Sequence, residues 1–142
     1  MIPARVSMIT LGVRDFERMR VFYRALGWAE FDPESVGHTV FKTGGGLLSL
    51  FPLADLAADA QVDAPSVQQF GGITLAVNVE RPEMVDAAAE VARAAGAQIT
   101  REPQHAFWGG RHAYFRDPEG NTWEIAWAPN AGFDERGAMI WA

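Results

Sequence analysis

A short strand-like motif occurs twice in this chain, and the repeat constrains the fold more than any other feature of the sequence. Thr10-Leu11-Gly12-Val13 recurs as Thr74-Leu75-Ala76-Val77, and a helical pattern follows each copy. Further along, the run from His38 to Lys42 matches the run from His112 to Arg116 in its order of residue types. Each half therefore reads as a strand, a helix and three more strands. Because neither half can bury both faces of its sheet alone, we expect the two halves to pair.

Helix start and stop signals place one helix in each half. The first helix begins near Asp15, a good N-cap, and stops at Gly27. The second begins near Pro82, which suits a first helical turn, and stops at Gly96. Within the single domain 1–142 we therefore expect a first module at about 5–52, a connector at 53–70 with a short helix over 53–60, a second module at about 71–128, and a tail at 129–142.

The stretch FWGGRHAYFRDPEGNTWEI, residues 107–125, is the most informative local segment. In it, Asp117-Pro118-Glu119-Gly120 has Asp, Pro and Gly at the positions that favour a tight turn, and strand-like residues flank the turn. Together with TLGVRDFERMRVFYRALGW at 10–28, this stretch resembles the vicinal oxygen chelate superfamily, which includes glyoxalase I, extradiol dioxygenases and bleomycin-resistance-type binding proteins. The resemblance covers about residues 6–129, and it is specific through the order, spacing and duplication of its short motifs.

This resemblance implies an α+β fold. Two pseudo-symmetric βαβββ modules would form a half-open mixed β-sheet barrel with the helices outside. Members of the superfamily are commonly homodimers, so we expect a homodimer here. The tail ends in Met139, Ile140 and Trp141. Such an apolar end more often docks on its own domain or on a partner subunit than extends freely into solvent.

The resemblance also implies where a metal would bind in metal-dependent members. A histidine three residues before the Leu of each opening strand is replaced here by Met8 and Gly72. A carboxylate or glutamine on the last strand of each module is matched by Glu124 in the second module, whereas the first has Ser49, or Leu50 if the register slips by one. A lone carboxylate does not hold a divalent ion against water. We therefore predict that the standard metal site is absent, and we expect no cofactor.

A relocated metal site is an alternative. His38, His112 and Glu124 lie on strands expected to be neighbours, and two histidines with one carboxylate form a known non-haem iron set. Both imidazoles would have to point into the cup, although the repeat places the two histidines in different modules. The other interpretation is that each histidine is a polar residue near the end of its strand.

Strand alternation predicts the side chains that line the cup, because alternate residues share a face. If Glu124 faces into the cup, Trp123 and Ile125 on the same strand face the helices. On the opening strands, the small or polar residues share one face. Ile9, Ile73 and the other aliphatic residues share the opposite face. The predicted ligand-binding residues are Met8, Thr10, Ser49, Gly72, Thr74, Trp108, His112, Tyr114 and Glu124.

Two of these residues allow more than one role. Trp108, beside Gly109 and Gly110, is either a lid that stacks on a ligand or part of the core that caps the barrel. Glu124 could contact a ligand, act as a general base, or form a salt bridge to Arg111 or Arg116. A binding role is the one we favour for Glu124.

Composition narrows the function further. The chain has no cysteine, which excludes disulfides and thiolate chemistry. A net charge of −6 argues against nucleic acid and is compatible with a neutral or cationic ligand. No apolar run approaches the roughly 18 residues of a membrane span, and no signal-peptide block is present, so we expect a cytoplasmic protein without a membrane partner.

These observations favour a glyoxalase-like or bleomycin-resistance-like protein that lacks the standard metal site and binds a small hydrophobic or cationic molecule in the cup. The alternative is a lyase, isomerase or dioxygenase-type enzyme with a rebuilt or metal-free active site that uses Glu124. A third possibility is a regulatory module whose cup carries no chemistry. The replaced histidines argue against a standard glyoxalase I or extradiol dioxygenase, but they do not separate binding from metal-free catalysis.

Overall fold

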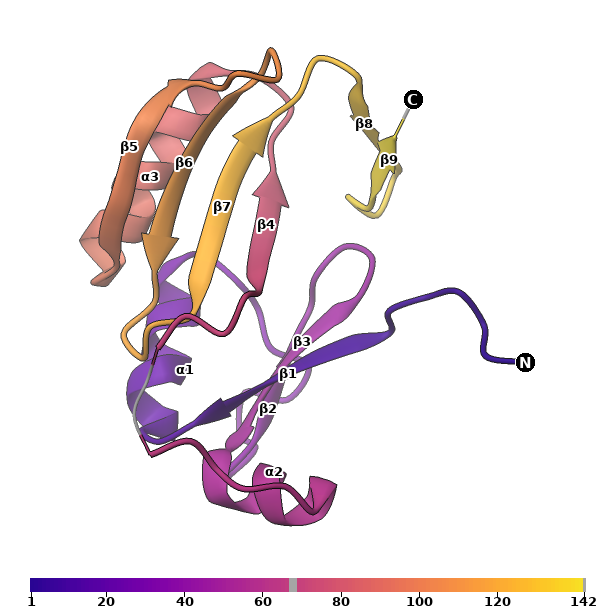
Figure 1. Ribbon diagram of the computed structural model, residues 1–142, viewed down its shortest axis with the longest axis vertical. Coiled ribbons are helices and arrows are strands. Elements are labelled where there is room, and N and C mark those ends of the chain that lie inside the picture. Colours follow the sequence, from indigo (N-terminus) through magenta and orange to yellow (C-terminus); the bar gives the residue numbers. More distant parts are fainter. Residues whose placement is uncertain (67–68, 142) are drawn as a thin grey trace.

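The computed structural model describes residues 1–66 and 69–141. Within these ranges, no helix is both long and apolar enough to cross a bilayer. The helices and strands are arranged as Figure 1 shows, in the order β1 (Met8–Val13), α1 (Phe16–Ala25), β2 (Thr39–Phe41), β3 (Leu47–Pro52), α2 (Leu53–Ala60), β4 (Thr74–Asn78), α3 (Glu83–Ala95), β5 (Gln98–His105), β6 (Arg111–Arg116), β7 (Thr122–Trp127), β8 (Ala131–Phe133) and β9 (Met139–Trp141).

The strands form separate sheets with related topologies. The first sheet has the order β1-β3-β2 and the second has the order β4-β7-β6-β5, while β8 and β9 form a hairpin of their own. In each of the first two sheets the opening strand runs parallel to its neighbour, and the remaining pairs are antiparallel. The mixed α+β fold is as predicted. The described strands do not join into one barrel sheet, and the half-open barrel stays a prediction.

We call β1–β3 with α1 the first module and β4–β7 with α3 the second; the exact boundaries of the modules, connector and tail stay a prediction. The second module is a complete βαβββ unit. The first lacks the strand expected after its helix, where only Glu30 forms a bridge, with Phe41. The chain turns away there because Asp32 Oδ1 accepts from the Glu34 N–H and the Arg20 guanidinium holds the carbonyls of the following loop.

The helix boundaries follow the predicted signals. Asp15 Oδ1 accepts from the Arg18 N–H at 3.0 Å and caps α1, and Gly27 has a φ of +92° just beyond that helix. α3 ends at Gly96 with a φ of 106°, and α2 covers the predicted range. Gly96 and Gly27 adopt a left-handed conformation that side chains disfavour, so they stop the helices as expected.

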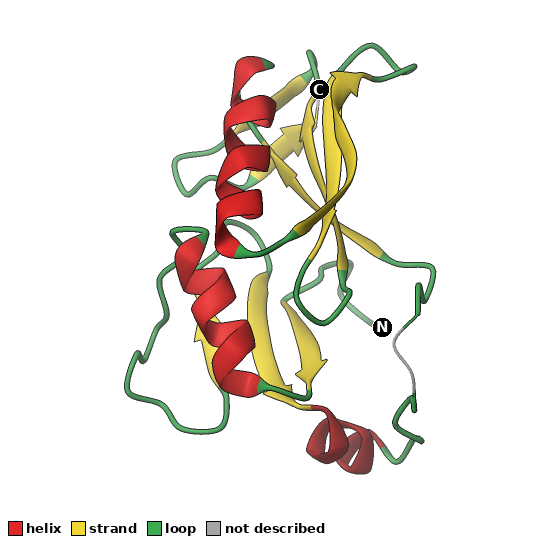
Figure 2. Ribbon diagram, turned by 90° about the vertical axis from the view of Figure 1, so that its left-hand side faces the viewer, coloured by secondary structure: helices red, strands yellow, loops and turns green. Residues whose placement is uncertain are grey.

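α1 and α3 cover the same side of the two sheets (Figure 2) and contact each other. The core between the helices and the strands contains Met19, Phe22, Tyr23, Val85, Phe115, Trp123 and Ile125. Trp123 and Ile125 therefore face the helices as predicted. The prediction for Ile73 was wrong: β4 begins only at Thr74, and Ile73 is 71% exposed.

The predicted turn at residues 117–120 joins the two modules. The Tyr23 hydroxyl donates to Asp117 Oδ2 at 2.7 Å and accepts from Trp123 Nε1 at 3.1 Å. Beside it, the Glu119 carboxylate accepts from the backbone N–H groups of Arg14 and Asp15, each at 2.8 Å. Carboxylates on the second module thus bind a buried hydroxyl and two backbone donors of the first, which fixes the relative orientation of the modules.

Candidate functional site

Three polar side chains meet on the face of the second sheet that points away from α3. Glu124 lies on β7, and its neighbours Tyr114 and His112 lie on β6. The Tyr114 hydroxyl donates to Glu124 Oε2 at 2.9 Å, and His112 Nδ1 lies 3.1 Å from the same oxygen. Both contacts fall on Oε2. No hydrogen bond of the other oxygen, Oε1, to a residue in the described part of the chain is present, so Oε1 remains available to a ligand.

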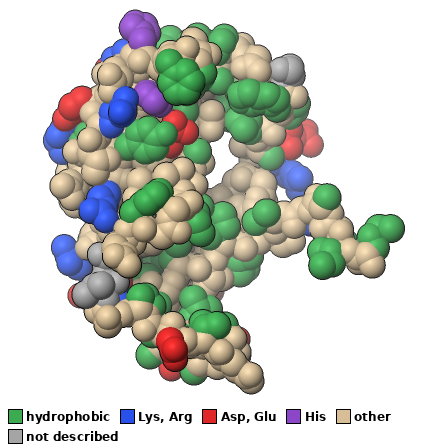
Figure 3. Space-filling model, in the orientation of Figure 1, with side chains coloured by type: hydrophobic (Ala, Val, Ile, Leu, Met, Phe, Trp, Pro, Cys, Tyr) green, Lys and Arg blue, Asp and Glu red, His purple; other side chains and the backbone are tan. Residues whose placement is uncertain are grey.

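The surroundings of this carboxylate set its chemistry. Burial, together with the hydrogen bond to Glu124, raises the pKa of the Tyr114 hydroxyl, so Tyr114 stays a proton donor near neutral pH. A neutral His112 that carries its proton on Nδ1 would donate to Glu124 and leave Nε2 as an acceptor. In Figure 3, histidine, acidic, basic and hydrophobic side chains gather over the part of the molecule occupied by β5–β7. The site thus combines one anionic group with an apolar border.

Trp108 supplies part of this border. Its ring lies edge-on to His112, with centroids 5.8 Å apart, and it is 39% exposed. The ring rests on Gly110, where an added Cβ would lie 2.0 Å from a Trp108 ring carbon. Phe107, at the tip of the same turn, is fully exposed. Trp108 is therefore a wall beside the polar cluster and has no place in the hydrophobic core, while Phe107 is a residue that the sequence did not single out.

The structure does not support a salt bridge from Glu124 to Arg111. The Arg111 guanidinium instead binds Asp86 on α3, with both nitrogen–oxygen distances at 2.7 Å. Among the described residues, the only ion-pair partner of Glu124 is His112. No arginine forms an ion pair with Glu124 among the described residues, although Arg101 on β5 lies opposite Tyr114 and its charge partly offsets the rise that burial causes in the Tyr114 pKa.

Among the described residues, no hydrogen bond or ring contact joins the other predicted residues to this cluster. Thr10 pairs with Ser49 and Met8 pairs with Leu47 in the first sheet. α2 covers part of that sheet, because a Cβ at Gly12 would lie 2.6 Å from the Leu53 side chain. In the second module Thr74 is exposed on the edge strand β4, and Gly72 precedes that strand with a φ of +83°. The structure therefore brings together His112, Tyr114, Glu124 and Trp108 alone from the predicted set.

The strand registers also correct the alignment of the repeat. Ile9 pairs with Leu48 and Leu75 pairs with Trp123, while the antiparallel partners of Leu48 and Trp123 are Phe41 and Phe115. This register matches Met8 with Thr74 and Ser49 with Glu124. Gly72 is consequently not the counterpart of Met8. In the first module the counterpart of Glu124 is Ser49, the first of the two alternatives, and not Leu50. The sequence similarity of TLGV and TLAV is offset by two residues from the structural repeat.

Four positions correspond to the metal ligands of metal-dependent members, and the residues at these positions do not fit a divalent metal. Met8, Thr74 and Ser49 offer a thioether and two neutral hydroxyls beside the single carboxylate of Glu124. Across residues 1–66 and 69–141, no group of three His, Cys, Asp or Glu side chains could hold an ion. His38 lies in the first module with its ring 6.1 Å from that of Phe51, so it does not complete a relocated site with His112 and Glu124.

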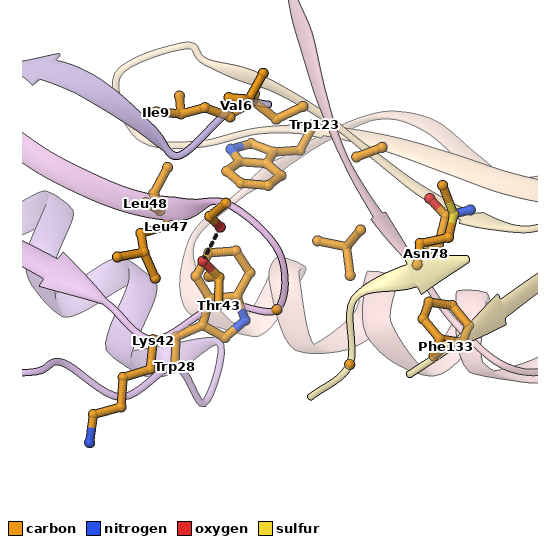
Figure 4. Close-up of a pocket in the computed structure, with 17 residues that line it drawn as sticks. Val6, Ile9, Trp28, Lys42, Thr43, Leu47, Leu48, Asn78, Trp123 and Phe133 are labelled. Carbon is orange, nitrogen blue, oxygen red and sulfur yellow. Dashed lines mark hydrogen bonds between the residues drawn. The ribbon is translucent and has the colours of Figure 1, made fainter. Parts of the chain in front are cut away.

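A separate cavity of about 530 Å³ lies between the two modules. None of the predicted ligand-binding residues lines it. Apolar side chains dominate its wall (Figure 4), among them Ile9, Trp28, Leu48, Leu75, Trp123 and Phe133. Trp123 follows the alternation of β7 and faces the side opposite Glu124. This cavity was not predicted from the sequence, because its wall combines residues from both modules and from the tail.

The fold and these residues define a protein of the glyoxalase type. The family model of the Glyoxalase/Bleomycin resistance protein/Dioxygenase superfamily matches residues 5–125. The chain belongs to this superfamily. A comparison with curated proteins gives no significant match.

Solved structures agree with this assignment. The chain is 30% identical to a glyoxalase-related enzyme from Fulvimarina pelagi, with a TM-score of 0.90 and coverage of 99% of both chains. A glyoxalase/bleomycin resistance protein/dioxygenase family enzyme from Burkholderia phytofirmans is 25% identical over 87% of this chain and 98% of its own, with a TM-score of 0.77. Lactoylglutathione lyase from Agrobacterium tumefaciens, at 21% identity, 89% and 95% coverage and a TM-score of 0.65, shares the fold.

Proposed function

We propose that this protein binds a small molecule on the open face of its second sheet, with an apolar body against Trp108 and a cationic group at Glu124. The observation that carries the proposal is the Glu124 carboxylate, which Tyr114 and His112 hold through one oxygen while the other stays available. The Trp108 ring lies beside His112, with ring centroids 5.8 Å apart, and aromatic rings attract cations. The site thus supports the hydrophobic or cationic ligand expected from the sequence.

The same hypothesis includes a half-open cup built from both sheets, a homodimer and a cytoplasmic location. β1 and β4 lie at the ends of their sheets, and such edges pair readily with another chain. The tail strand β9 exposes Trp141 to 64%, which supports a role in contacts between subunits. The net charge of −6 supports a small-molecule partner over nucleic acid or an anionic membrane.

A second candidate function is metal-free catalysis with Glu124 as the general base. The arrangement of Tyr114 and His112 around the Glu124 carboxylate favours it, because three groups able to accept or donate protons lie within hydrogen-bond distance. The Fulvimarina pelagi protein, described as a glyoxalase-related enzyme, supports an enzymatic role. The reaction would be of the lyase or isomerase type, because the residues do not fit the metal that dioxygenase chemistry of this family needs. Glu124→Gln should then abolish turnover without changing the fold.

The binding proposal can be tested with benzyltrimethylammonium and its neutral isostere neopentylbenzene, measured by equilibrium dialysis. The cation should bind more tightly to the natural protein, and Glu124→Gln should remove this difference. Trp108→Ala should weaken both compounds by more than about 1 kcal/mol, a typical loss for an aromatic contact. Glu90→Gln, on α3 behind the sheet, removes the same charge and should change neither affinity. Equal binding of the cation by the Glu124→Gln variant and the natural protein would exclude this site.

A further inference from the structure

The cavity between the modules is closed on one side by the C-terminal hairpin. Its wall comes from β1, from the β2–β3 turn, from β4 and from the hairpin β8–β9. Figure 3 shows the molecule hollowed between these parts. Its volume of about 530 Å³ lies within the range of about 300–1,000 Å³ that is usual for small-molecule sites. The cavity is therefore large enough for a ligand of two or three rings.

Two indoles form the inner end of the cavity. Trp28 comes from the first module and Trp123 from the second, and their rings meet edge-on with centroids 5.5 Å apart. Phe133 of the hairpin adds a third aromatic ring to the wall. Edge-on and offset aromatic contacts are favourable beyond the area that they bury. The wall is therefore suited to a flat aromatic compound.

The polar groups of the wall limit the ligand to one hydrogen-bonding group. Thr43 is already occupied, because its hydroxyl donates to the Gly46 carbonyl at 2.6 Å. The Lys42 ammonium lies over the Phe31 ring, 5.6 Å from its centroid, and points away from the cavity in Figure 4. Asn78, at the end of β4, faces the cavity, and no hydrogen bond of its amide to another described side chain is present. The cavity therefore offers an uncharged donor and acceptor and no charge.

The glycines of the β2–β3 turn approach the hairpin and the segment before β1 closely. A Cβ at Gly44 in the β2–β3 turn would lie 2.6 Å from the Gly137 carbonyl oxygen, and one at Gly46 would lie 2.8 Å from the Val6 carbonyl oxygen. Only glycine permits such an approach, which explains the glycine run at residues 44–46. The hairpin lies beyond residues 5–125, which the family model matches.

We propose that the cavity between the modules is a second small-molecule site, which takes an uncharged aromatic compound with one hydrogen-bonding group directed at Asn78. It is independent of the site at Glu124. None of Glu124, Tyr114, His112 and Trp108 lines the cavity, although Ala76 and Asn78 of its wall lie on the same face of the sheet as Glu124. A ligand in the cavity would touch residues of both modules and of the hairpin at once.

The experiment uses 2-naphthol and its isostere 2-methylnaphthalene in equilibrium dialysis against the full chain. We expect one molecule of 2-naphthol per chain, bound more tightly than 2-methylnaphthalene. Asn78→Leu should weaken 2-naphthol by about fivefold and leave 2-methylnaphthalene unchanged, as expected for the loss of one hydrogen bond. Gly44→Ala should weaken both by about tenfold or more, because the added methyl group displaces the hairpin.

Two controls make these results specific. Gly71→Ala adds the same methyl group where nothing lies within 4 Å and should leave both affinities unchanged. Glu124→Gln alters the other site and should also leave them unchanged. Absence of binding, or binding that Asn78→Leu and Gly44→Ala do not affect, would overturn the proposal. Binding that falls with rising protein concentration, while sedimentation velocity shows a dimer forming, would overturn it in favour of a second copy of the chain in the cavity.

Discussion

The Tyr23 hydroxyl of the first module donates a 2.7 Å hydrogen bond to Asp117 of the second module, and both groups are buried. This hydroxyl also accepts from Trp123, so it joins a helix of one module to a turn and a strand of the other. Removing this hydroxyl affects both the buried Asp117 carboxylate and the buried N–H of Trp123. The stability of the module junction should therefore depend strongly on this one oxygen atom.

Tyr23→Phe should lower the free energy of unfolding by about 2–3 kcal/mol, because it removes one of the two donors to the buried Asp117 Oδ2, which keeps only Asn121 Nδ2, and leaves the buried Trp123 Nε1 without its acceptor. Urea denaturation followed by far-UV circular dichroism measures this loss. Tyr114→Phe is the matched control, since the Tyr114 hydroxyl lies on the open sheet face, and it should change the stability by less than about 1 kcal/mol. Equal stability of the two variants would show that the Tyr23 contact does not hold the modules together.

Asp117 should make the stability depend on pH in a specific direction. Burial raises the pKa of the Asp117 carboxyl above its ordinary value of 3.8 in the folded state. The folded protein then binds a proton more readily than the unfolded chain. The contribution of this group is fully present below pH 3.8 and is lost as the pH rises through the raised folded pKa.

The stability of the natural protein relative to Asp117→Asn should therefore increase as the pH falls through this window. The asparagine does not titrate, so the comparison isolates the carboxyl from the other acids of the chain. Urea midpoints of both proteins, measured at closely spaced pH values, test the slope. A stability difference that decreases toward low pH would mean that Asp117 has the opposite shift in pKa.

Gly110→Ala should lower the free energy of unfolding by at least about 2 kcal/mol, because the new methyl group overlaps backbone that cannot move away easily. Its Cβ would lie 2.2 Å from the Trp127 carbonyl oxygen, in addition to its overlap with the Trp108 ring. Thermal unfolding compares this variant with Gly71→Ala, where the added Cβ meets nothing within 4 Å. Matching melting temperatures for the two variants would contradict the tight packing at Gly110.

Purified protein should contain no stoichiometric transition metal. We expect elemental analysis to find none after purification without chelators or a metal-binding tag, and after incubation with Ni(II), Fe(II), Mn(II) or Zn(II). The reason is the donor set, in which Glu124 has only Met8, Thr74 and Ser49 as partners at the positions concerned. About one equivalent per chain that disappears in Glu124→Ala would instead show that a rebuilt metal site exists.

Much of the fold followed from local signals in the sequence. Asp15, Gly27 and Gly96 mark helix ends through backbone geometry that depends on a few neighbouring residues, so their prediction needed no tertiary information. Alternation along β7 likewise placed Trp123 in the core and Glu124 on the opposite face. Ile73 was wrongly placed on β4, which begins at Thr74, because the sequence repeat does not reveal which strand residues pair.

The candidate site was harder to predict. Glu124, His112 and Tyr114 come from two adjacent strands, so a strand register was enough to bring them together. The first-module residues Met8 and Ser49 share no element with that cluster, and their distance from it depends on how the sheets are oriented. The cavity between the modules depends on the hairpin, whose contact with Gly44 joins segments far apart in the chain.

The edge-on contact of Trp28 and Trp123 has a spectroscopic consequence. One indole belongs to each module, and with centroids 5.5 Å apart their electronic transitions couple. Such coupling produces a paired positive and negative band in circular dichroism, whose size falls steeply as the rings move apart. The size of this band pair therefore reports the distance between the two modules without any added label.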